Sequence, residues 1–201
     1  MSAPLWQPSE LAQIAGGQLD GIVTSPITGF SIDSRTLEPG EVYVAIRGDV
    51  HDGHKFAALA LEDGASMALI SKPDGEMRAA GPLLIVEGDP LEALEKIGRA
   101  ARQRATGKVL AITGSVGKTG TKEMLRACLS RSGTVHASQK SYNNHWGVPL
   151  TLANFPPDVD FGVFEVGMNH PGEIMTLVDM IRPELAIITT VEPVHLGYFN
   201  S

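Results

Sequence analysis

The chain has 201 residues, of which 43% are hydrophobic and 19% charged, and its formal net charge is −7. This length allows one or two domains, and the balance is that of a globular protein, not of a disordered or collagen-like chain. The acidic net charge gives no support to nucleic-acid binding, since a phosphate backbone selects basic surfaces. A local basic pocket for a small anion stays open.

Cys128 is the single cysteine, so the fold cannot depend on an internal disulfide or on an oxidising compartment. The helical apolar pattern around it predicts a buried packing residue. The first eight residues lack the basic start and apolar run of a signal peptide. The longest apolar stretches, such as 185–188, are far too short for a membrane span. These features predict a cytoplasmic protein.

The first half of the chain carries helix and strand signals in turn. Caps, apolar periodicity and glycine positions define them. In chain order we expect a short helix capped by Ser9, a strand over 42–46, a helix over 56–61 with Gly64 after its end, and strands over 67–70 and 83–86.

A strong helix start follows at Asp89. Asp89 can cap the helix and Pro90 suits its first position, because proline has no N–H to lose there. We expect this helix to run to about Ala105, where Thr106-Gly107 breaks the pattern. The two predicted domains are 1–106 and 107–201.

The second half alternates strand and helix. Such alternation predicts a parallel sheet with right-handed crossovers. The expected fold class is therefore α/β, with a small mixed α/β N-terminal domain followed by a P-loop, parallel-sheet ATP-binding domain. The expected strands are 109–112, 161–166 and 185–191, and the expected helices are 118–131 and 171–181.

A glycine-bearing loop joins the strand over 109–112 to the next helix. Glycines let the backbone wrap around phosphate, and the helix start offers free N–H groups and a positive dipole end. Lys118 supplies a charge for the β- and γ-phosphates, and Thr119 a hydroxyl for Mg²⁺. The strict phosphate-loop pattern needs glycine where Ile112 stands, so the match is to a shorter variant; an ordinary glycine turn with a surface lysine is the alternative. The predicted nucleotide-binding residues are Gly114, Ser115, Val116, Gly117, Lys118, Thr119 and Gly120.

Two further polar residues follow the ends of expected strands. Ligands in open parallel sheets sit beyond the carboxyl ends of the strands. Glu165 there could hold Mg²⁺ through oxygen, and His195 could hold a metal or a phosphate. A solvated strand-end glutamate and a structural histidine are the alternatives.

Three polar loops could also bind ligands. The segment 141–149 contains Asn143 and Asn144, which could contact a polar ligand, or Asn144 could cap a helix. In the first half, 31–35 and 48–54 lie near strand ends. Arg35 could meet a phosphate, but composition alone favours turn chemistry for both segments.

Together these segments resemble the Mur ligases of peptidoglycan synthesis, and among them the type that adds D-alanyl-D-alanine. The likeness runs in order along nearly the whole chain. It is carried by 31–36 with 39–40, by 52–56, 113–119, 142–152 and 165–174, and by the ending 189–196.

The resemblance implies a bacterial, cytoplasmic, ATP- and Mg²⁺-dependent ligase that serves cell wall biogenesis, and with it cell shape and division. ATP would phosphorylate the carboxylate of UDP-N-acetylmuramoyl tripeptide, and the amine of D-alanyl-D-alanine would attack the acyl phosphate. By this likeness Lys118, Glu165 and His195 are the catalytic residues. Thr119 and Glu165 would hold one Mg²⁺, and His195 a second.

The resemblance also assigns substrate contacts and partners. It implies no nucleic acid, no membrane insertion and a monomer at full length. The UDP end would be held by Ser34, Arg35, Asp52, Gly53 and His54, and the sugar–peptide part would approach Asn143 and Asn144.

Two departures from the family pattern stand out. Gly120 occupies a position where a second hydroxyl residue is common. The family also continues past Ser201 through a metal-binding lysine, the rest of the central domain and a C-terminal domain, so the likeness implies an N-terminal portion that is inactive alone. Two alternatives stay open: a sister ligase that adds a single amino acid, and a non-catalytic module that binds nucleotide or UDP-sugar-peptide.

Overall fold

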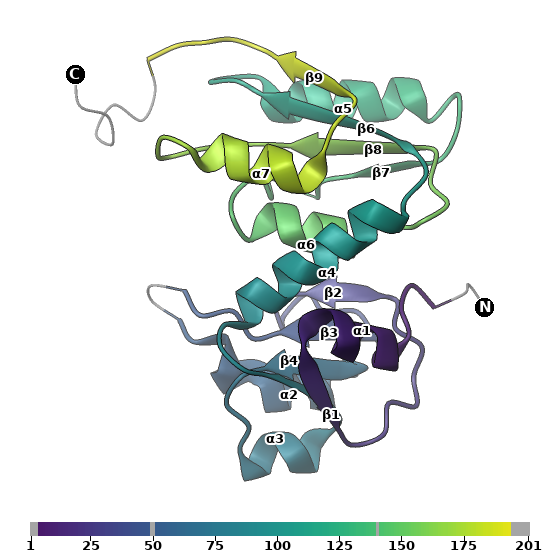
Figure 1. The fold of residues 1–201 in the computed structure, drawn as a ribbon, viewed down its shortest axis with the longest axis vertical. Helices are drawn as coiled ribbons and strands as arrows, with labels where there is room; N and C mark the ends of the chain where they lie inside the picture. Colours follow the sequence, from purple (N-terminus) through teal and green to yellow (C-terminus); the bar gives the residue numbers. More distant parts are fainter. Residues whose placement is uncertain (1–3, 49–50, 140, 194–201) are drawn as a thin grey trace. The chain divides into compact units, whose positions relative to one another are not determined.

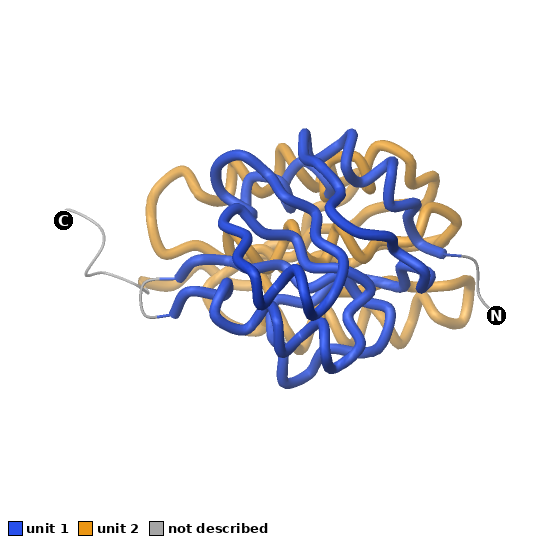
Figure 2. Tube along the Cα trace, turned by 90° about the horizontal axis from the view of Figure 1, so that it is seen from below, with its two compact units in different colours: residues 1–97 blue, residues 98–201 orange. Residues whose placement is uncertain are grey.

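The computed structural model describes residues 4–48, 51–139 and 141–193. The chain divides into two compact units, residues 1–97 and 98–201 (Figure 2). The division falls inside helix α4 (Pro90–Arg104), so that one helix contributes residues to both units. The domain boundary expected after residue 106 stays a prediction.

Unit 1 is built on a five-stranded sheet in the order β1-β5-β4-β3-β2. Figure 1 labels four of these strands, β1 to β4, together with α1, α2 and α3. β1 pairs antiparallel with β5, and the other pairs are parallel. This is the small mixed α/β domain that the sequence predicted. Its strands are β1 (Gly17–Asp20), β2 (Gly29–Ser31), β3 (Glu41–Val44), β4 (Met67–Ile70) and β5 (Leu83–Val86), and its other elements are α1 (Pro8–Ala15), the 3₁₀ turn η1 (Gly53–Phe56), α2 (Ala57–Glu62) and α3 (Gly75–Ala80).

One face of this sheet is covered by α2 and α3. Tyr43, Ala68 and Leu83 of the strands share a buried cluster with Ala60 of α2 and Met77 of α3. β4 is buried along its whole length. Continuous apolar runs are expected in strands of a parallel sheet whose two faces are both covered. The strands predicted over 67–70 and 83–86 are confirmed as β4 and β5.

Local signals set the helix ends of unit 1. α1 begins at Pro8 with Gln7 at its N-cap, so the prediction that Ser9 caps it is wrong: proline fixes the first helical position one residue earlier. Gly64, at φ +104°, follows α2 as expected. Asp89 Oδ1 accepts the N–H of Leu91 over 2.9 Å, which confirms the predicted cap of α4.

Unit 2 carries a four-stranded sheet in the order β7-β8-β6-β9, with every pair parallel. This confirms the parallel sheet expected from the alternation of elements. Its strands are β6 (Lys108–Thr113), β7 (Val135–Ala137), β8 (Phe161–Glu165) and β9 (Leu185–Ile188), and its helices besides the end of α4 are α5 (Lys118–Leu129), α6 (Gly147–Ala153) and α7 (Glu173–Ile181).

The core of unit 2 lies on the face of the sheet that α6 and α7 cover. Val109 and Ala111 of β6 alternate onto this face and share a cluster with Phe164 of β8, Leu152 of α6 and Leu177 of α7. α5 contacts β6, β7 and β8 but adds no residue to this cluster, and so packs on the opposite face. Unit 2 is therefore a layered α/β unit, with α5 on one face of its sheet and α6 and α7 on the other.

Cys128 is exposed, so its predicted burial is wrong. In α5 the buried side chain is that of Lys122, and Cys128 lies six residues on, about 120° round the helix from it at roughly 100° per residue. The apolar pattern of α5 therefore does not mark its buried face. β9, the last strand in the sheet order, exposes Leu185 and Ile188. Within the described part of the chain, no helix is long and apolar enough to cross a membrane.

Candidate nucleotide and metal site

The phosphate loop lies between the end of β6 at Thr113 and the start of α5 at Lys118. Gly114 and Gly117 have φ of +130° and +89°, a region that side chains disfavour. A Cβ at Gly114 would also collide with the Thr189 hydroxyl. Both glycines are thus required by the backbone path of the loop that precedes α5.

Lys118 folds back over this loop. Its Nζ donates to the carbonyl oxygens of Gly114 (2.6 Å) and Ser115 (3.3 Å). These contacts hold the ammonium group at the mouth of the loop, beside the start of α5. A positive charge and a helix N-terminus together favour a phosphate group.

The segment that follows β9 fixes the loop from the other side. The carbonyl of Thr190 accepts the N–H of Ser115 (2.8 Å), and Thr189 Oγ1 donates to the carbonyl of Val116 (2.6 Å). Ser115 Oγ and Glu192 exchange two further bonds, of 2.9 and 3.0 Å. Sequence reasoning assigned no role to these threonines; their place after a strand that pairs with β6 was the available signal.

The two predicted magnesium ligands of the described chain meet beside the loop. Thr119 Oγ1 donates to Glu165 Oε2 over 2.9 Å, and Asn143 Nδ2 donates to Glu165 Oε1 over 2.7 Å. Glu165 is only 1% exposed. A carboxylate and a hydroxyl are ligands that Mg²⁺ prefers, with phosphate and water filling its other positions. The residues present therefore fit a nucleotide-bound Mg²⁺.

The remaining predicted site residues of unit 2 are Asn144, Gly120 and His195. Asn144 Oδ1 accepts the N–H of Gly147, the first residue of α6, over 2.9 Å, whereas the N-cap position itself is Trp146. A Cβ at Gly120 would meet nothing within 4 Å, so the family's common hydroxyl residue could be accommodated there. His195 lies outside the described residues. Within those residues, no group of three or more His, Cys, Asp or Glu side chains is arranged to hold a metal.

In unit 1 the loop over 52–54 forms a hydrogen-bonded network. Ser71 N donates to His54 Nε2 over 3.1 Å, so the geometry assigns the ring proton to Nδ1, which donates to Asp52 Oδ1 over 2.7 Å. This bond lowers the pKa of Asp52. Tyr43 donates to the carbonyl of Gly53 over 3.0 Å; burial, helped by the charges of acidic neighbours, raises its pKa to about 12.

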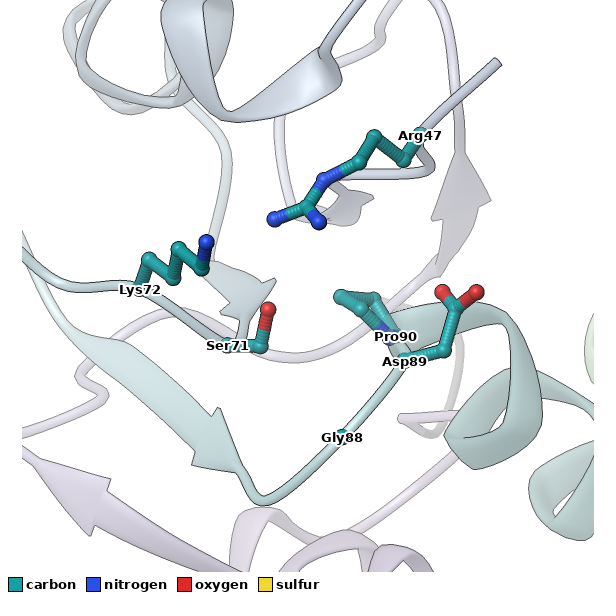
Figure 3. Close-up of a pocket in the computed structure, with 6 residues that line it drawn as sticks. All are labelled: Arg47, Ser71, Lys72, Gly88, Asp89 and Pro90. Atoms are coloured by element: carbon teal, nitrogen blue, oxygen red, sulfur yellow. The ribbon is translucent and has the colours of Figure 1, made fainter. Parts of the chain in front are cut away.

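The same network supports a pocket of about 360 Å³ in unit 1. Asp52 Oδ2 lies 3.5 Å from Arg47 Nε, and His54 holds Ser71. Figure 3 shows the Arg47 and Lys72 side chains converging on this pocket, with Asp89 on another side. The lining carries two cations and one carboxylate, and Arg47 is also paired with Asp52 behind the wall. The pocket is lined by Arg47, Ser71, Lys72, Gly88, Asp89 and Pro90.

Asp52 and His54 therefore act behind this pocket, and the residues that line it were not identified from the sequence. Arg47 and Lys72 each follow a strand of the sheet, β3 and β4, and that position was the available signal. The Arg35 side chain makes two 2.8 Å bonds to Asp33 within its own turn, and Ser34 is half-buried in that turn.

Two family models match successive parts of the chain. The model described as "Mur ligase family, catalytic domain" matches residues 26–102, and that described as "Mur ligase middle domain" matches 112–201. The chain belongs to the Mur ligase family, whose members are ATP-dependent ligases.

Two curated relatives share one name. UDP-N-acetylmuramoyl-tripeptide–D-alanyl-D-alanine ligase of Synechocystis is 39% identical over 87% of this chain and 38% of its own length. The enzyme of that name from Escherichia coli is 38% identical over 96% of this chain and 42% of its own length. The chain thus spans about two fifths of these relatives.

Solved structures agree. MurF from Acinetobacter baumannii matches with a TM-score of 0.84 and 35% identity, over 99% of this chain and 44% of its own. MurF ligase from Thermotoga maritima, solved in complex with ADP, matches with a TM-score of 0.68 and 30% identity, over 85% of this chain and 39% of its own. The fold of both units is therefore that of MurF structures.

Proposed function

We propose that the full-length protein is an ATP-dependent ligase that joins D-alanyl-D-alanine to UDP-N-acetylmuramoyl tripeptide in the bacterial cytoplasm. The contact between Thr119 and Glu165 beside the phosphate loop carries this proposal. It supplies a hydroxyl and a buried carboxylate next to the Lys118 ammonium group, and sites of phosphoryl transfer use groups of these kinds. The names of the relatives supply the two substrates.

The reaction proceeds through an acyl phosphate. The tripeptide carboxylate takes the γ-phosphoryl group of ATP and releases ADP; the dipeptide amine then attacks the carbonyl, forms the amide and releases phosphate and a proton. Lys118 and the N–H groups at the start of α5 would neutralise the phosphates, and Thr119 with Glu165 would hold Mg²⁺, which would supply further charge neutralisation. A second metal at His195 is part of the proposal.

The UDP end of the substrate binds in unit 1. The support is the pocket with Arg47 and Lys72, since paired cations suit a diphosphate. Asp52 and His54 hold this wall in place. Substrate contacts with Ser34, Arg35 and Gly53 are proposed for unit 1. Contacts of the sugar–peptide part with Asn143 and Asn144 are proposed separately for unit 2.

The test is phosphate release by the full-length protein with ATP, Mg²⁺ and UDP-N-acetylmuramoyl tripeptide, adding D-alanyl-D-alanine or single amino acids in turn. We expect release only with the dipeptide, and a loss of about a hundredfold or more in Lys118→Ala. Lys108→Ala, an exposed lysine at the start of β6, is the matched control and should keep full activity. Release that needs a single amino acid would move the protein to a sister ligase.

The isolated 201-residue chain tests the remaining alternative, which is a non-catalytic binding module. We expect it to form no amide product. Binding of ATP or of the UDP-linked tripeptide by this chain, with no ligation by the full-length protein, would favour a binding module. We further propose a monomer at full length that binds neither nucleic acid nor membrane.

A further inference from the structure

Lys122 is a lysine buried to 1% exposure inside unit 2. It lies on α5, one turn after Thr119. Its Nζ donates to the carbonyl of Ser138 over 2.7 Å and lies 3.3 Å from Glu123 Oε1. Burying an ammonium group is costly unless it is hydrogen-bonded and paired, and Lys122 has both kinds of partner.

Ser138 carries the contact onward to the candidate metal site. It is 2% exposed and directly follows β7. Its N–H donates to the carbonyl of Val163 on β8 over 3.1 Å, and its Oγ accepts the backbone N–H of Glu165 over 3.1 Å. Ser138 therefore connects the Lys122 ammonium group with the backbone of the residue whose carboxylate meets Thr119.

These contacts form a closed series of hydrogen bonds. From α5 the path runs through Lys122 and Ser138 to the backbone of Glu165, and from its carboxylate through Thr119 back to α5. Each link is a hydrogen bond of 3.1 Å or less, and three of its members are nearly inaccessible to water. This closed series of hydrogen bonds fixes the distance between the first turn of α5 and the end of β8. A metal held by residues of both elements requires such a fixed distance.

We propose that Lys122, acting through Ser138, is a positioning residue that sets the affinity of the Thr119–Glu165 site for a divalent cation. This inference rests on the proposed function. Lys122 touches neither nucleotide nor metal; it holds the Ser138 carbonyl so that the Ser138 hydroxyl meets the Glu165 N–H. The Glu165 carboxylate is thereby kept where both Thr119 and a cation can reach it.

The experiment is a Mg²⁺ titration of ATP binding and of phosphate release, at saturating ATP, in the full-length protein. Lys122→Met keeps the length of the side chain and removes its donor. We expect the Mg²⁺ midpoint to rise about tenfold or more, as for other residues behind metal ligands, while kcat at saturating Mg²⁺ changes less than twofold. Ser138→Ala removes only the hydroxyl and should shift the midpoint in the same direction.

Glu123→Gln is the matched control, because it removes the exposed partner of Lys122 but leaves the Ser138 contact. Its Mg²⁺ midpoint should equal that of the wild type. A lowered melting temperature with an unchanged midpoint in Lys122→Met, or an unchanged midpoint in Ser138→Ala where Lys122→Met does not fold, overturns the proposal. An equal shift in Glu123→Gln overturns it too. Failure of the proposed function is distinct: the wild type would then release no phosphate in response to the dipeptide.

Discussion

Thr119 and Glu165 stand 46 residues apart in the chain, and the hydroxyl of one donates to the carboxylate of the other over 2.9 Å. The bond joins the first turn of α5 to the carboxyl end of β8. β8 pairs with β6, the strand that leads into the phosphate loop. The sheet topology therefore brings a metal-binding pair beside the loop that holds phosphate.

Thr119→Val tests the hydroxyl of this pair. Valine keeps the shape of threonine and removes its oxygen, and Thr119 is exposed, so the melting temperature should change little. We expect the Mg²⁺ concentration needed for ATP binding, measured by calorimetry on the full-length protein, to rise at least about tenfold. Thr121→Val, two residues further along α5, is the control. An unchanged Mg²⁺ requirement would remove Thr119 from the metal site.

Arg47→Ala tests the pocket of unit 1. Loss of a charged hydrogen bond to a phosphate costs about 1.5–3 kcal/mol, roughly 10–100-fold. The KM for UDP-N-acetylmuramoyl tripeptide should rise by that factor, with the KM for ATP unchanged, and Lys72→Ala should act in the same way. Arg78→Ala removes an exposed arginine paired with Asp20 and should change neither constant. A raised KM for ATP alone would contradict the assignment of this pocket.

The parts of the fold that could be predicted have signals contained in a few neighbouring residues. The cap and proline of α4, the apolar runs of β4 and β5, and the loop before α5 belong to this class. α6 was raised only as a helix that Asn144 could cap, without bounds, because all seven of its residues are buried and it has no polar face to create a helical period. β1, β2 and β7 have three or four residues each and carry too little pattern.

The same distinction holds for the site. Lys118 and Thr119 were read from a contiguous motif. The contacts of Thr189 with the loop depend on β9 lying next to β6, and the contact of Ser138 with Glu165 depends on β7 lying next to β8. Strand order is a tertiary property, so the residues that support the loop and the carboxylate could not be identified from spacing alone.

Arg102→Met tests the buried arginine of unit 2. Its guanidinium donates to the carbonyls of Ile181 (2.7 Å) and Arg182 (3.0 Å), which end α7, and to Glu184 (3.1 Å). Removing it leaves the buried carbonyl of Ile181 without this donor, and we expect the free energy of unfolding to fall by about 2 kcal/mol.

Arg99→Ala is the control for that measurement. Arg99 pairs with Asp179 over 2.9 Å on an exposed surface, where ion pairs contribute little, and its loss should change the free energy of unfolding by less than about 0.5 kcal/mol. Urea unfolding of both variants in the full-length protein measures the two values. Equal losses would mean that the burial of Arg102 adds nothing.

His136 makes the stability of unit 2 depend on pH. Its ring packs against Phe155, with ring centroids 5.4 Å apart, and its Nε2 lies 3.0 Å from the carbonyl of Thr151, which requires a proton on Nε2. Burial lowers the pKa of His136 from its ordinary value of 6.5. The neutral form therefore belongs to the folded state, whereas the unfolded chain takes up a proton below about pH 6.5.

The sign follows from proton counting. Below about pH 6.5 the unfolded state binds more protons than the folded state, so the contribution of His136 is complete above that pH and is lost as the pH falls towards the lowered folded pKa. His136→Gln keeps an N–H donor and does not titrate. We expect the drop in free energy of unfolding between pH 7.5 and 5.5, measured with urea, to be smaller in His136→Gln than in the wild type. Equal drops would show that His136 is protonated in the folded protein at little cost.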